Sequence, residues 1–321
     1  MTFAGSPDRV EARLVPERGY EFDAFSISGL PRRPGLDLLR ALGVAARAPA
    51  ACRRILARRR PDVVLGAGGY VAGPMVLAAW SRRIPAALTE ADAHLGLANR
   101  LAAPFASRVF LALPIGRDGS KYEAVGRPVP AASRPVPQDE ARARLELPAQ
   151  GSVVLVFGGS LGARILNELA VEAWGESGPA ILHLCGTRDY DALKERVTRD
   201  DYHLVPFLDE IGVAYGAADV AAARAGGSVW ELAAAGLPAV LVPGEFATGG
   251  HQEKNARWFE RAGGAVVVPE AEIDRVPEVV SGLLADPVRL ARMAASMCLA
   301  AKPDAAERIA DELLDLAAAR R

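Results

Sequence analysis

The chain has 321 residues, of which 50% are hydrophobic, and its formal net charge is −1. This length favours about two domains, and the near-neutral charge argues against a nucleic-acid-binding protein. The three cysteines are widely spaced and the four histidines lack metal-ligand spacing, so we expect reduced thiols rather than disulfides or a zinc site. No apolar run reaches the ~18 residues of a membrane span, and the start lacks a signal-peptide pattern. We therefore expect a soluble, cytosolic α/β protein.

The first half of the chain alternates short apolar runs with helical patterns. We predict strands over residues 61–66, 84–88 and 108–113, with helices over about 70–80 and 97–103. This order is typical of a parallel, doubly wound sheet. The turn Ala-Gly-Gly-Tyr at 67–70 follows the first strand, and Thr-Glu-Ala-Asp at 89–92 follows the second.

Between Leu38 and Pro61, arginine is the only charged residue type, and apolar residues such as Ile55 are interleaved. The arginines are Arg40, Arg47, Arg53, Arg54, Arg58, Arg59 and Arg60. A basic amphipathic helix can lie on an anionic membrane surface. A solvated helix face explains the same pattern, and from the residues alone we favour that explanation; nucleic-acid binding is a weaker alternative.

Proline-rich residues 126–137 break both periodicities and indicate a linker to a second βα series. The strands expected there cover 153–157, 180–184, 202–206, 218–222, 238–242 and 265–268. Asp304-Ala305-Ala306-Glu307 matches a capping box, which predicts the start of the last helix. We expect two Rossmann-like, doubly wound domains facing a cleft, formed by residues 1–128 with 304–321 and by residues 129–303. Ligands should bind at the carboxyl ends of the strands.

The turn after the strand 153–157 reads Gly158-Gly159-Ser160-Leu161-Gly162. Glycines let the backbone turn sharply and approach a ligand, and a helix from about Leu161 would direct its free N–H groups at that turn. Such a helix start binds phosphate or diphosphate without a lysine, and Ser160 adds a hydroxyl donor. The spacing matches neither G-x-G-x-x-G nor the Walker pattern, so a tight turn without a ligand is the alternative.

A second glycine turn, Gly226-Gly227-Ser228, precedes a helix with Glu231 in its first turn. The helix dipole alone would stabilise a carboxylate there. Alternatively, the Glu231 carboxylate accepts hydrogen bonds from both hydroxyls of a ribose. The polar loop 249–255 includes His251 and Gln252, whose groups suit sugar hydroxyls. Loop capping is the alternative for Gln252 and Asn255.

Taken together and in this order, these motifs are specific, and the chain resembles the MurG-type glycosyltransferase family of peptidoglycan synthesis over nearly its whole length. The matching segments are Ile27–Leu30, Gly68–Pro74, Gly158–Ala163, Glu231–Pro238, His251-Gln252 with Asn255-Ala256, and Pro303–Ala305. The resemblance implies an inverting, metal-independent enzyme without a cofactor. It would transfer N-acetylglucosamine from UDP-N-acetylglucosamine to undecaprenyl-pyrophosphoryl-MurNAc-pentapeptide (lipid I).

The resemblance also implies a role for each part of the donor site. The diphosphate would lie at the Ser160 turn, the uracil at the Leu208 backbone, the ribose at Glu231 and the sugar at Gln252. The whole implied donor set is Ser160, Leu161, Gly162, Leu208, Gly226, Gly227, Ser228, Glu231, His251, Gln252 and Arg127. The acceptor pyrophosphate would face Gly68, Gly69, Tyr70 and Gly73.

The family's opening strand and its loop Gly-Gly-Thr-Gly-Gly-His, whose histidine is a favoured catalytic base, have no counterpart in this sequence. We therefore expect exposed strand edges in the first domain. The remaining candidates for the base are Asp92, Glu90 and His94, although a solvent-exposed or capping role explains His94 equally well. A lipid-linked acceptor would add weight to the Arg40–Arg60 segment as a contact with an anionic membrane surface, at the cytoplasmic face of the plasma membrane.

Three alternatives to this assignment remain. One is a UDP-sugar transferase with a different acceptor, and another is a UDP-N-acetylglucosamine epimerase on the same two-domain fold. The third is a catalytically inactive protein that binds a sugar nucleotide or a partner. Turnover of the free sugar nucleotide without an acceptor would identify the epimerase, and binding without turnover would identify the inactive protein.

Overall fold

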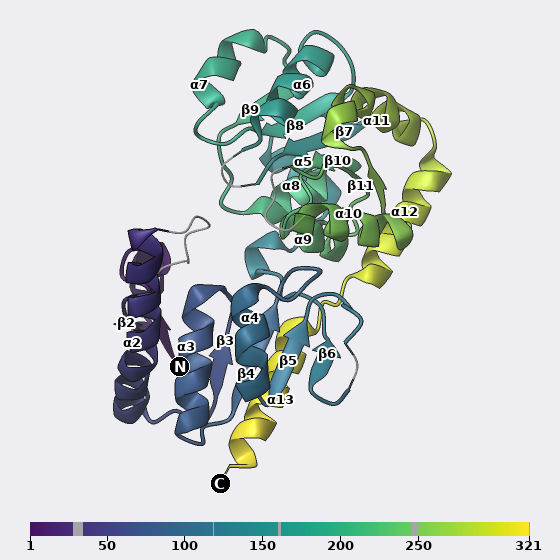
Figure 1. Ribbon diagram of the computed structural model, residues 1–321. Coiled ribbons are helices and arrows are strands. Elements are labelled where there is room, and N and C mark those ends of the chain that lie inside the picture. The colour runs from purple at the N-terminus through teal and green to yellow at the C-terminus, as the bar shows by residue number, and fades with distance from the viewer. Residues whose placement is uncertain (28–34, 118, 160–161, 246–249, 321) are drawn as a thin grey trace. The chain divides into compact units, whose positions relative to one another are not determined.

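The computed structural model describes residues 1–27, 35–117, 119–159, 162–245 and 250–320 (Figure 1). The chain forms two compact units. The first unit comprises Met1–Gly126 and Asp304–Arg321, and the second comprises Arg127–Pro303. Both are built on parallel strands packed against helices. The predicted α/β class with parallel sheets is therefore confirmed.

The second unit contains a six-stranded parallel sheet in the order β12-β11-β10-β7-β8-β9. Its strands are β7 (Val153–Phe157), β8 (Ala180–Leu184), β9 (Tyr202–Val205), β10 (Val220–Ala223), β11 (Ala239–Leu241) and β12 (Ala265–Val267). β7, β8, β10 and β11 are buried along their whole length, as expected for parallel strands with both faces covered. The strand order reverses between β7 and β10. In open α/β sheets, ligands bind at the carboxyl ends of the strands at such a point.

The second unit also contains eight α-helices in the described ranges. They are α5 (Gln138–Arg144), α6 (Arg164–Trp174), α7 (Tyr190–Leu193), α8 (Ile211–Ala217), α9 (Ser228–Ala234), α10 (His251–Arg261), α11 (Val276–Leu284) and α12 (Pro287–Ala300). Leu166 of α6 and Val280 of α11 join Val156 of β7 in one fully buried core. This packing fixes β7, and with it the turn that follows, in a rigid frame.

In the first unit, β3 (Val64–Gly66), β4 (Ala86–Glu90), β5 (Arg108–Leu111) and β6 (Tyr122–Ala124) form a parallel sheet in chain order. The helices are α1 (Glu11–Glu17), α2 (Leu36–Arg59), α3 (Gly69–Ser81), α4 (Leu97–Ala102) and α13 (Ala305–Ala318). Figure 1 shows α2 beside α3, and Leu56 and Val76 of these helices share a buried core. The C-terminal helix α13 belongs to this unit because Ile309 packs against Ala87 and Phe110.

Two further strands of the first unit, β1 (Thr2–Gly5) and β2 (Glu21–Ala24), pair with each other in a sheet of their own. Among the described strands, β1 pairs only with β2, and β3 pairs only with β4. Phe3 on β1 and Leu65 on β3 are exposed. These open edges agree with the expectation of exposed strand edges in this unit.

Several local expectations are wrong. β4 does not end at Leu88 but continues to Glu90, which pairs with Leu111 of β5. The helix after the first glycine turn begins at Arg164 rather than near Leu161. α13 begins at Ala305 as predicted, but within the described chain the Asp304 side chain makes no capping hydrogen bond. Its φ of −82° and ψ of 1° depart from the extended conformation of a capping residue.

Three strands, β1, β2 and β6, were not predicted from the periodicity, because each is only 3 or 4 residues long and lacks a clear alternation. No helix in the described ranges is both long enough and apolar enough to span a bilayer.

Candidate functional site

The glycines after β7 are required by the turn itself. A Cβ on Gly158 would lie 2.3 Å from the backbone nitrogen of Ala163, and one on Gly162 would lie 2.1 Å from the carbonyl oxygen of Cys185. Gly159 and Gly162 have φ angles of 93° and 71°, in the left-handed region that favours glycine. The Gly162 N–H donates to Gly159 O at 2.9 Å, so this amide is committed to the turn rather than to a ligand.

The start of α6 follows this turn. The predicted diphosphate ligands Ser160 and Leu161 lie outside the described residues. The N–H of Leu166 donates to Ala163 O. The N–H groups of Arg164 and Ile165 have no hydrogen-bond partner among the described residues, as is typical of the first turn of a helix.

A buried hydrogen-bond network holds the Cys185 carbonyl that borders the turn. Asn167 Nδ2 donates to Cys185 O at 2.8 Å and to Asp189 Oδ2 at 3.0 Å. Asn167 Oδ1 is therefore an acceptor, so His183 Nε2 donates to it at 3.0 Å and His183 Nδ1 accepts from the Tyr202 hydroxyl at 2.9 Å. Burial lowers the pKa of His183 to about 3. This histidine is consequently a neutral, structural member of the turn's support.

The second glycine turn follows β10. A Cβ on Gly226 would meet nothing within 4 Å, so the space beside it is open. A Cβ on Gly227 would lie 2.5 Å from Nη1 of Arg127. The Arg127 guanidinium therefore rests on this turn, immediately before Ser228 begins α9. A cation at the point of strand-order reversal suits an anionic ligand.

Glu231, in the first turn of α9, is half-buried and is held by two hydroxyl groups. Ser133 Oγ and the Tyr215 hydroxyl both donate to Glu231 Oε2, each at 2.9 Å. Burial and then the nearby carboxylate raise the pKa of Tyr215, so its hydroxyl keeps the proton that it donates. Glu231 Oε1 has no hydrogen-bond partner in the described part of the chain. The carboxylate can therefore accept a hydrogen bond from a ligand through that oxygen.

The loop predicted at His251, Gln252 and Asn255 is wrong, because all three residues lie in α10, where Gln252 and Asn255 have structural roles. Gln252 Oε1 accepts from the Gly244 N–H at 2.8 Å, and its side-chain amide donors have no partner among the described residues. Asn255 is buried, and its Nδ2 donates to Ala225 O at 3.4 Å, linking α10 to the second glycine turn. His251 is the first residue of α10 and is half-buried. Asn255 and the side-chain oxygen of Gln252 therefore do hold backbone groups of neighbouring loops, as the alternative interpretation expected.

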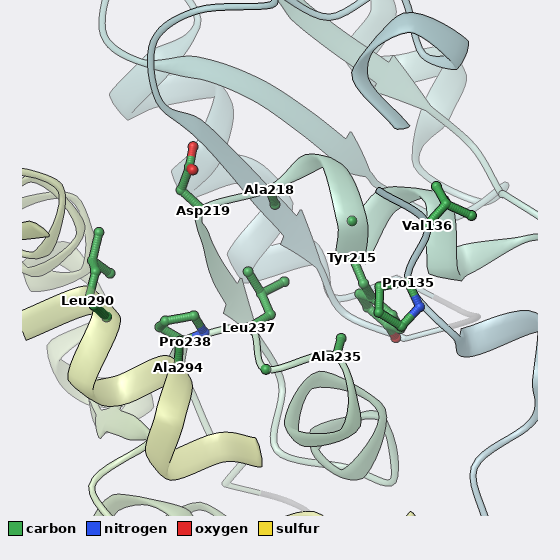
Figure 2. A pocket seen from close by; sticks show the side chains of 13 residues that line it. Pro135, Val136, Tyr215, Ala218, Asp219, Ala235, Leu237, Pro238, Leu290 and Ala294 are labelled. Atoms are coloured by element: carbon green, nitrogen blue, oxygen red, sulfur yellow. The ribbon is translucent and has the colours of Figure 1, made fainter. Parts of the chain in front are cut away.

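A cavity of about 360 Å³ lies at the other edge of the sheet, where β10 and β11 begin. Figure 2 shows Tyr215, Pro135 and Leu237 on its wall, with Asp219 at one side and Leu290 on α12. Because it lies at the amino ends of these strands, this cavity is not the candidate ligand site. It matters because the Tyr215 ring forms part of its wall, while the hydroxyl of the same residue binds Glu231.

The predicted acceptor loop lies in the first unit, after β3. Gly68 and Gly69 have φ angles of 92° and 69°, so both occupy the region that favours glycine. Tyr70 is exposed. A Cβ on Gly73 would lie 3.9 Å from Ala98 O, an ordinary contact, so a close approach of α3 to α4 does not demand a glycine there.

The three candidates for the base lie at the end of β4 and in the segment just after it, in the same unit. Glu90 is buried and accepts hydrogen bonds from the N–H groups of Asp92 and Gly96 and from Asn99 Nδ2, at 3.2, 2.8 and 2.9 Å. Both of its oxygens are therefore engaged in holding the loop. Asp92 is half-buried, and His94 Nδ1 is buried without a partner in the described residues. Because β3 and β4 are adjacent and parallel, these residues and the Gly68 turn share one sheet edge.

Comparison with known proteins identifies the family. The model of the glycosyltransferase family 28 N-terminal domain matches residues 2–111, and that of its C-terminal domain matches residues 153–309. This chain belongs to glycosyltransferase family 28. It is 40% identical, over 99% of its length and 88% of the relative's, to a Salinibacter ruber protein named UDP-N-acetylglucosamine–N-acetylmuramyl-(pentapeptide) pyrophosphoryl-undecaprenol N-acetylglucosamine transferase.

Solved structures agree with the family 28 assignment. The crystal structure of Acinetobacter baumannii MurG has a TM-score of 0.77 and 28% identity, over 98% of this chain and 90% of that one. A UDP-N-acetylglucosamine 2-epimerase from Listeria monocytogenes has a TM-score of 0.62 at 14% identity, over 96% of this chain and 94% of that one, which shows a shared fold alone.

In this family 28 chain, the second unit brings several predicted residues to one sheet edge: Gly162, Gly226, Gly227, Ser228, Glu231 and Arg127. Leu208 lies in the loop after β9, at the far end of that edge, and is half-buried. The sequence did not predict Ser133 and Tyr215 as part of the site. They lie 98 and 16 residues from Glu231 in the chain, and neither spacing indicates a contact with that acid. No group of three or more His, Cys, Asp or Glu residues in the described ranges is arranged to hold a metal ion.

Proposed function

We propose that this chain is an inverting glycosyltransferase that moves N-acetylglucosamine from UDP-N-acetylglucosamine to lipid I, forming lipid II. The observation that carries the proposal is family membership across both units, with a 40% identical relative named for this transfer. The site in the second unit supports a nucleotide donor. It combines open space beside Gly226, the Arg127 cation and the Glu231 carboxylate, whose Oε1 has no partner among the described residues.

In this proposal the donor binds to the second unit. Its diphosphate lies between the start of α6 and Arg127, where amide donors and a guanidinium neutralise charge. The ribose hydroxyls donate to Glu231, the uracil meets the Leu208 backbone, and the amide of Gln252, with His251 beside it, contacts the sugar. Gly68, Gly69, Tyr70 and Gly73 of the first unit face the acceptor pyrophosphate.

The reaction is a direct displacement without a metal. The acceptor 4-hydroxyl oxygen forms a bond to the anomeric carbon, the bond from that carbon to the diphosphate oxygen breaks, and UDP leaves with the electron pair. Arg127 and the amides of α6 stabilise the charge that develops on UDP. A general base takes the hydroxyl proton. Asp92 is the preferred candidate, because both oxygens of Glu90 already accept hydrogen bonds from the loop.

Contact with an anionic membrane surface, at the cytoplasmic face of the plasma membrane, belongs to the same proposal because the acceptor is lipid-linked. In the Arg40–Arg60 segment, Arg58 and Arg59 pair with Asp23, and Arg47, Arg54, Arg58 and Arg60 are exposed. The first unit also exposes Trp80 of α3 and Leu97 and Leu101 of α4. Exposed cations and apolar side chains both strengthen binding to a membrane interface.

The test is transfer of labelled N-acetylglucosamine from UDP-N-acetylglucosamine to purified lipid I in detergent. We expect label in the lipid and one UDP released per transfer, with no turnover when lipid I is omitted. Turnover of the sugar nucleotide without acceptor would favour an epimerase. Donor binding without turnover in either condition would favour an inactive sugar-nucleotide-binding protein.

A further inference from the structure

Two hydroxyl groups on different elements converge on one oxygen of Glu231. Ser133 Oγ and the Tyr215 hydroxyl each lie 2.9 Å from Oε2, and in the described residues Oε1 has no partner. We propose that Tyr215 and Ser133 are positioning residues that fix the Glu231 carboxylate, with Oε1 free, for the ribose hydroxyls of a uridine nucleotide. This inference rests on the proposed function and adds to it two residues that touch no ligand themselves.

The backbone around these hydroxyls is packed to bring them together. A Cβ on Gly212 of α8 would lie 2.0 Å from Arg134 O, and one on Gly216 would lie 2.2 Å from Val136 O. Glycine at these two positions therefore lets α8 lie directly on the segment that follows Ser133. Tyr215 comes from this same helix, so the close packing places both hydroxyls beside one carboxylate oxygen.

Tyr215 also connects the ribose acid to the diphosphate turn. Its ring lies 6.0 Å, centroid to centroid, from the ring of Phe157, the last residue of β7 before that turn. Tyr215 also lines the cavity in Figure 2, although the residue is buried from solvent. The hydrogen bond to Glu231 thus fixes the tyrosine as well as the acid.

Holding the carboxylate in advance should favour binding for a physical reason. A free glutamate side chain samples several rotamers, and a ligand that selects one must offset the lost side-chain entropy. Two hydrogen bonds to Oε2 restrict the carboxylate before the ligand arrives. Both hydroxyls belong to buried residues, so they donate to the carboxylate rather than to water.

The test compares the affinity of the full-length chain for UDP and for 2′,3′-dideoxy-UDP by titration calorimetry. The two ligands differ only in the ribose hydroxyls, so the ratio of their dissociation constants isolates the contact with Glu231. Tyr215→Phe, which keeps the ring as the cavity wall, should weaken UDP roughly tenfold and leave dideoxy-UDP unchanged. Ser133→Ala should act in the same direction. Adding Tyr215→Phe to Glu231→Ala should change neither constant further.

Tyr202→Phe is the matched control, because it removes another buried hydroxyl, the one bonded to His183, from the same unit. It should leave the ratio of the two constants as in the unsubstituted chain. The inference is wrong if Glu231→Ala removes the preference for UDP while Tyr215→Phe and Ser133→Ala both retain it. If the unsubstituted chain binds UDP and dideoxy-UDP equally well, Glu231 does not bind the ribose hydroxyls. If the chain binds no UDP, the proposed function itself is contradicted. Circular dichroism verifies folding, and Ser133→Ala tests the idea should Tyr215→Phe unfold.

Discussion

The guanidinium of Arg127 rests directly on Gly227, so closely that a Cβ on this glycine would lie 2.5 Å from Nη1. Arg127 is the first residue of the second unit, and Gly227 immediately precedes α9. Arg127 thus supplies a cation at the point of the sheet where the strand order reverses. A glycine beneath it leaves room for the guanidinium to lie flat on the backbone.

Replacing Arg127 with alanine should weaken UDP binding by about tenfold or more, because a charge-assisted hydrogen bond contributes about 1.5–3 kcal/mol. Uridine, which lacks the diphosphate, should bind as before. Titration calorimetry of both ligands measures the difference. Arg134→Ala is the control, since Arg134 is an exposed arginine of the same segment. Equal losses for UDP and uridine would show that Arg127 does not contact the diphosphate.

Gly162→Ala should destabilise the second unit by about 2 kcal/mol or more. The new Cβ would lie 2.1 Å from Cys185 O, at a residue whose φ is 71°. Urea denaturation measures the loss, and UDP affinity should fall with it because the turn must shift. Gly282→Ala is the matched control, because its Cβ would meet nothing within 4 Å inside α11, so it should be neutral or stabilising. Equal stability of the two variants would contradict the structure of this turn.

The buried His183 makes stability depend on pH in a defined direction. Its pKa is lowered to about 3 from an ordinary value of 6.5, so the folded chain keeps it neutral while the unfolded chain binds a proton. The stabilisation is fully present above pH 6.5 and is lost as the pH falls from 6.5 towards 3. Between pH 6.5 and 5 the loss should be about 1.6 kcal/mol.

Urea denaturation at these two pH values tests this, with His183→Gln as the comparison. Glutamine keeps a donor and an acceptor but does not titrate, so this variant should show a smaller loss. An identical pH dependence in both proteins would assign the effect to other groups.

The strand-turn-helix order of the second unit could be predicted because its apolar runs are long and glycines interrupt them. β7 and β8 have the bounds predicted from such runs. The same reasoning placed Glu90 in a loop, because a buried acid at a strand end looks like a turn residue. In fact Glu90 completes β4, and its charge is satisfied by hydrogen bonds from Gly96 and Asn99.

The side-chain support of the candidate site could not be predicted. The Ser133–Glu231 hydrogen bond joins residues 98 positions apart, and only the packing of α8 on the segment after Ser133 brings them together. Glycine patterns predict a turn, but they do not distinguish a glycine required by the backbone from one required by a ligand. Gly162 is of the first kind, whereas the open space beside Gly226 permits the second.

Binding of the chain to vesicles should require both cations and apolar side chains of the first unit. The double change Arg47→Glu and Arg54→Glu should reduce flotation with vesicles that contain anionic phospholipid, because each basic residue near such a surface contributes about 1 kcal/mol. Trp80→Ser should reduce it by loss of apolar contact. Arg144→Glu, an exposed site in the second unit, is the control. Flotation that is independent of anionic lipid would refute the role of the arginines.

Asp92 and Glu90 should respond differently to removal of their charge. Asp92→Asn should lower kcat by about 10²- to 10⁴-fold, the usual contribution of a general base. Folding should be preserved, because the contact of Asp92 with Glu90 uses its backbone N–H. Glu90→Gln should instead lower the free energy of unfolding by about 1–3 kcal/mol. Its new amide group would face either the N–H of Asp92 or the donors of Gly96 and Asn99, all of which now bind a carboxylate oxygen.

Measuring kcat and urea denaturation for both variants separates the two roles, since a base affects kcat alone and a loop anchor affects stability. His94→Gln tests the third candidate, whose Nδ1 is buried without a partner among the described residues. If Glu90→Gln is as stable as the unsubstituted chain but loses kcat, while Asp92→Asn keeps it, the assignments are reversed. A carboxylate base makes kcat/KM fall on the acidic side of the pH profile, where the base gains a proton. Loss of this acidic limb in Asp92→Asn alone would support Asp92 as the base. Loss of the basic limb instead would contradict it.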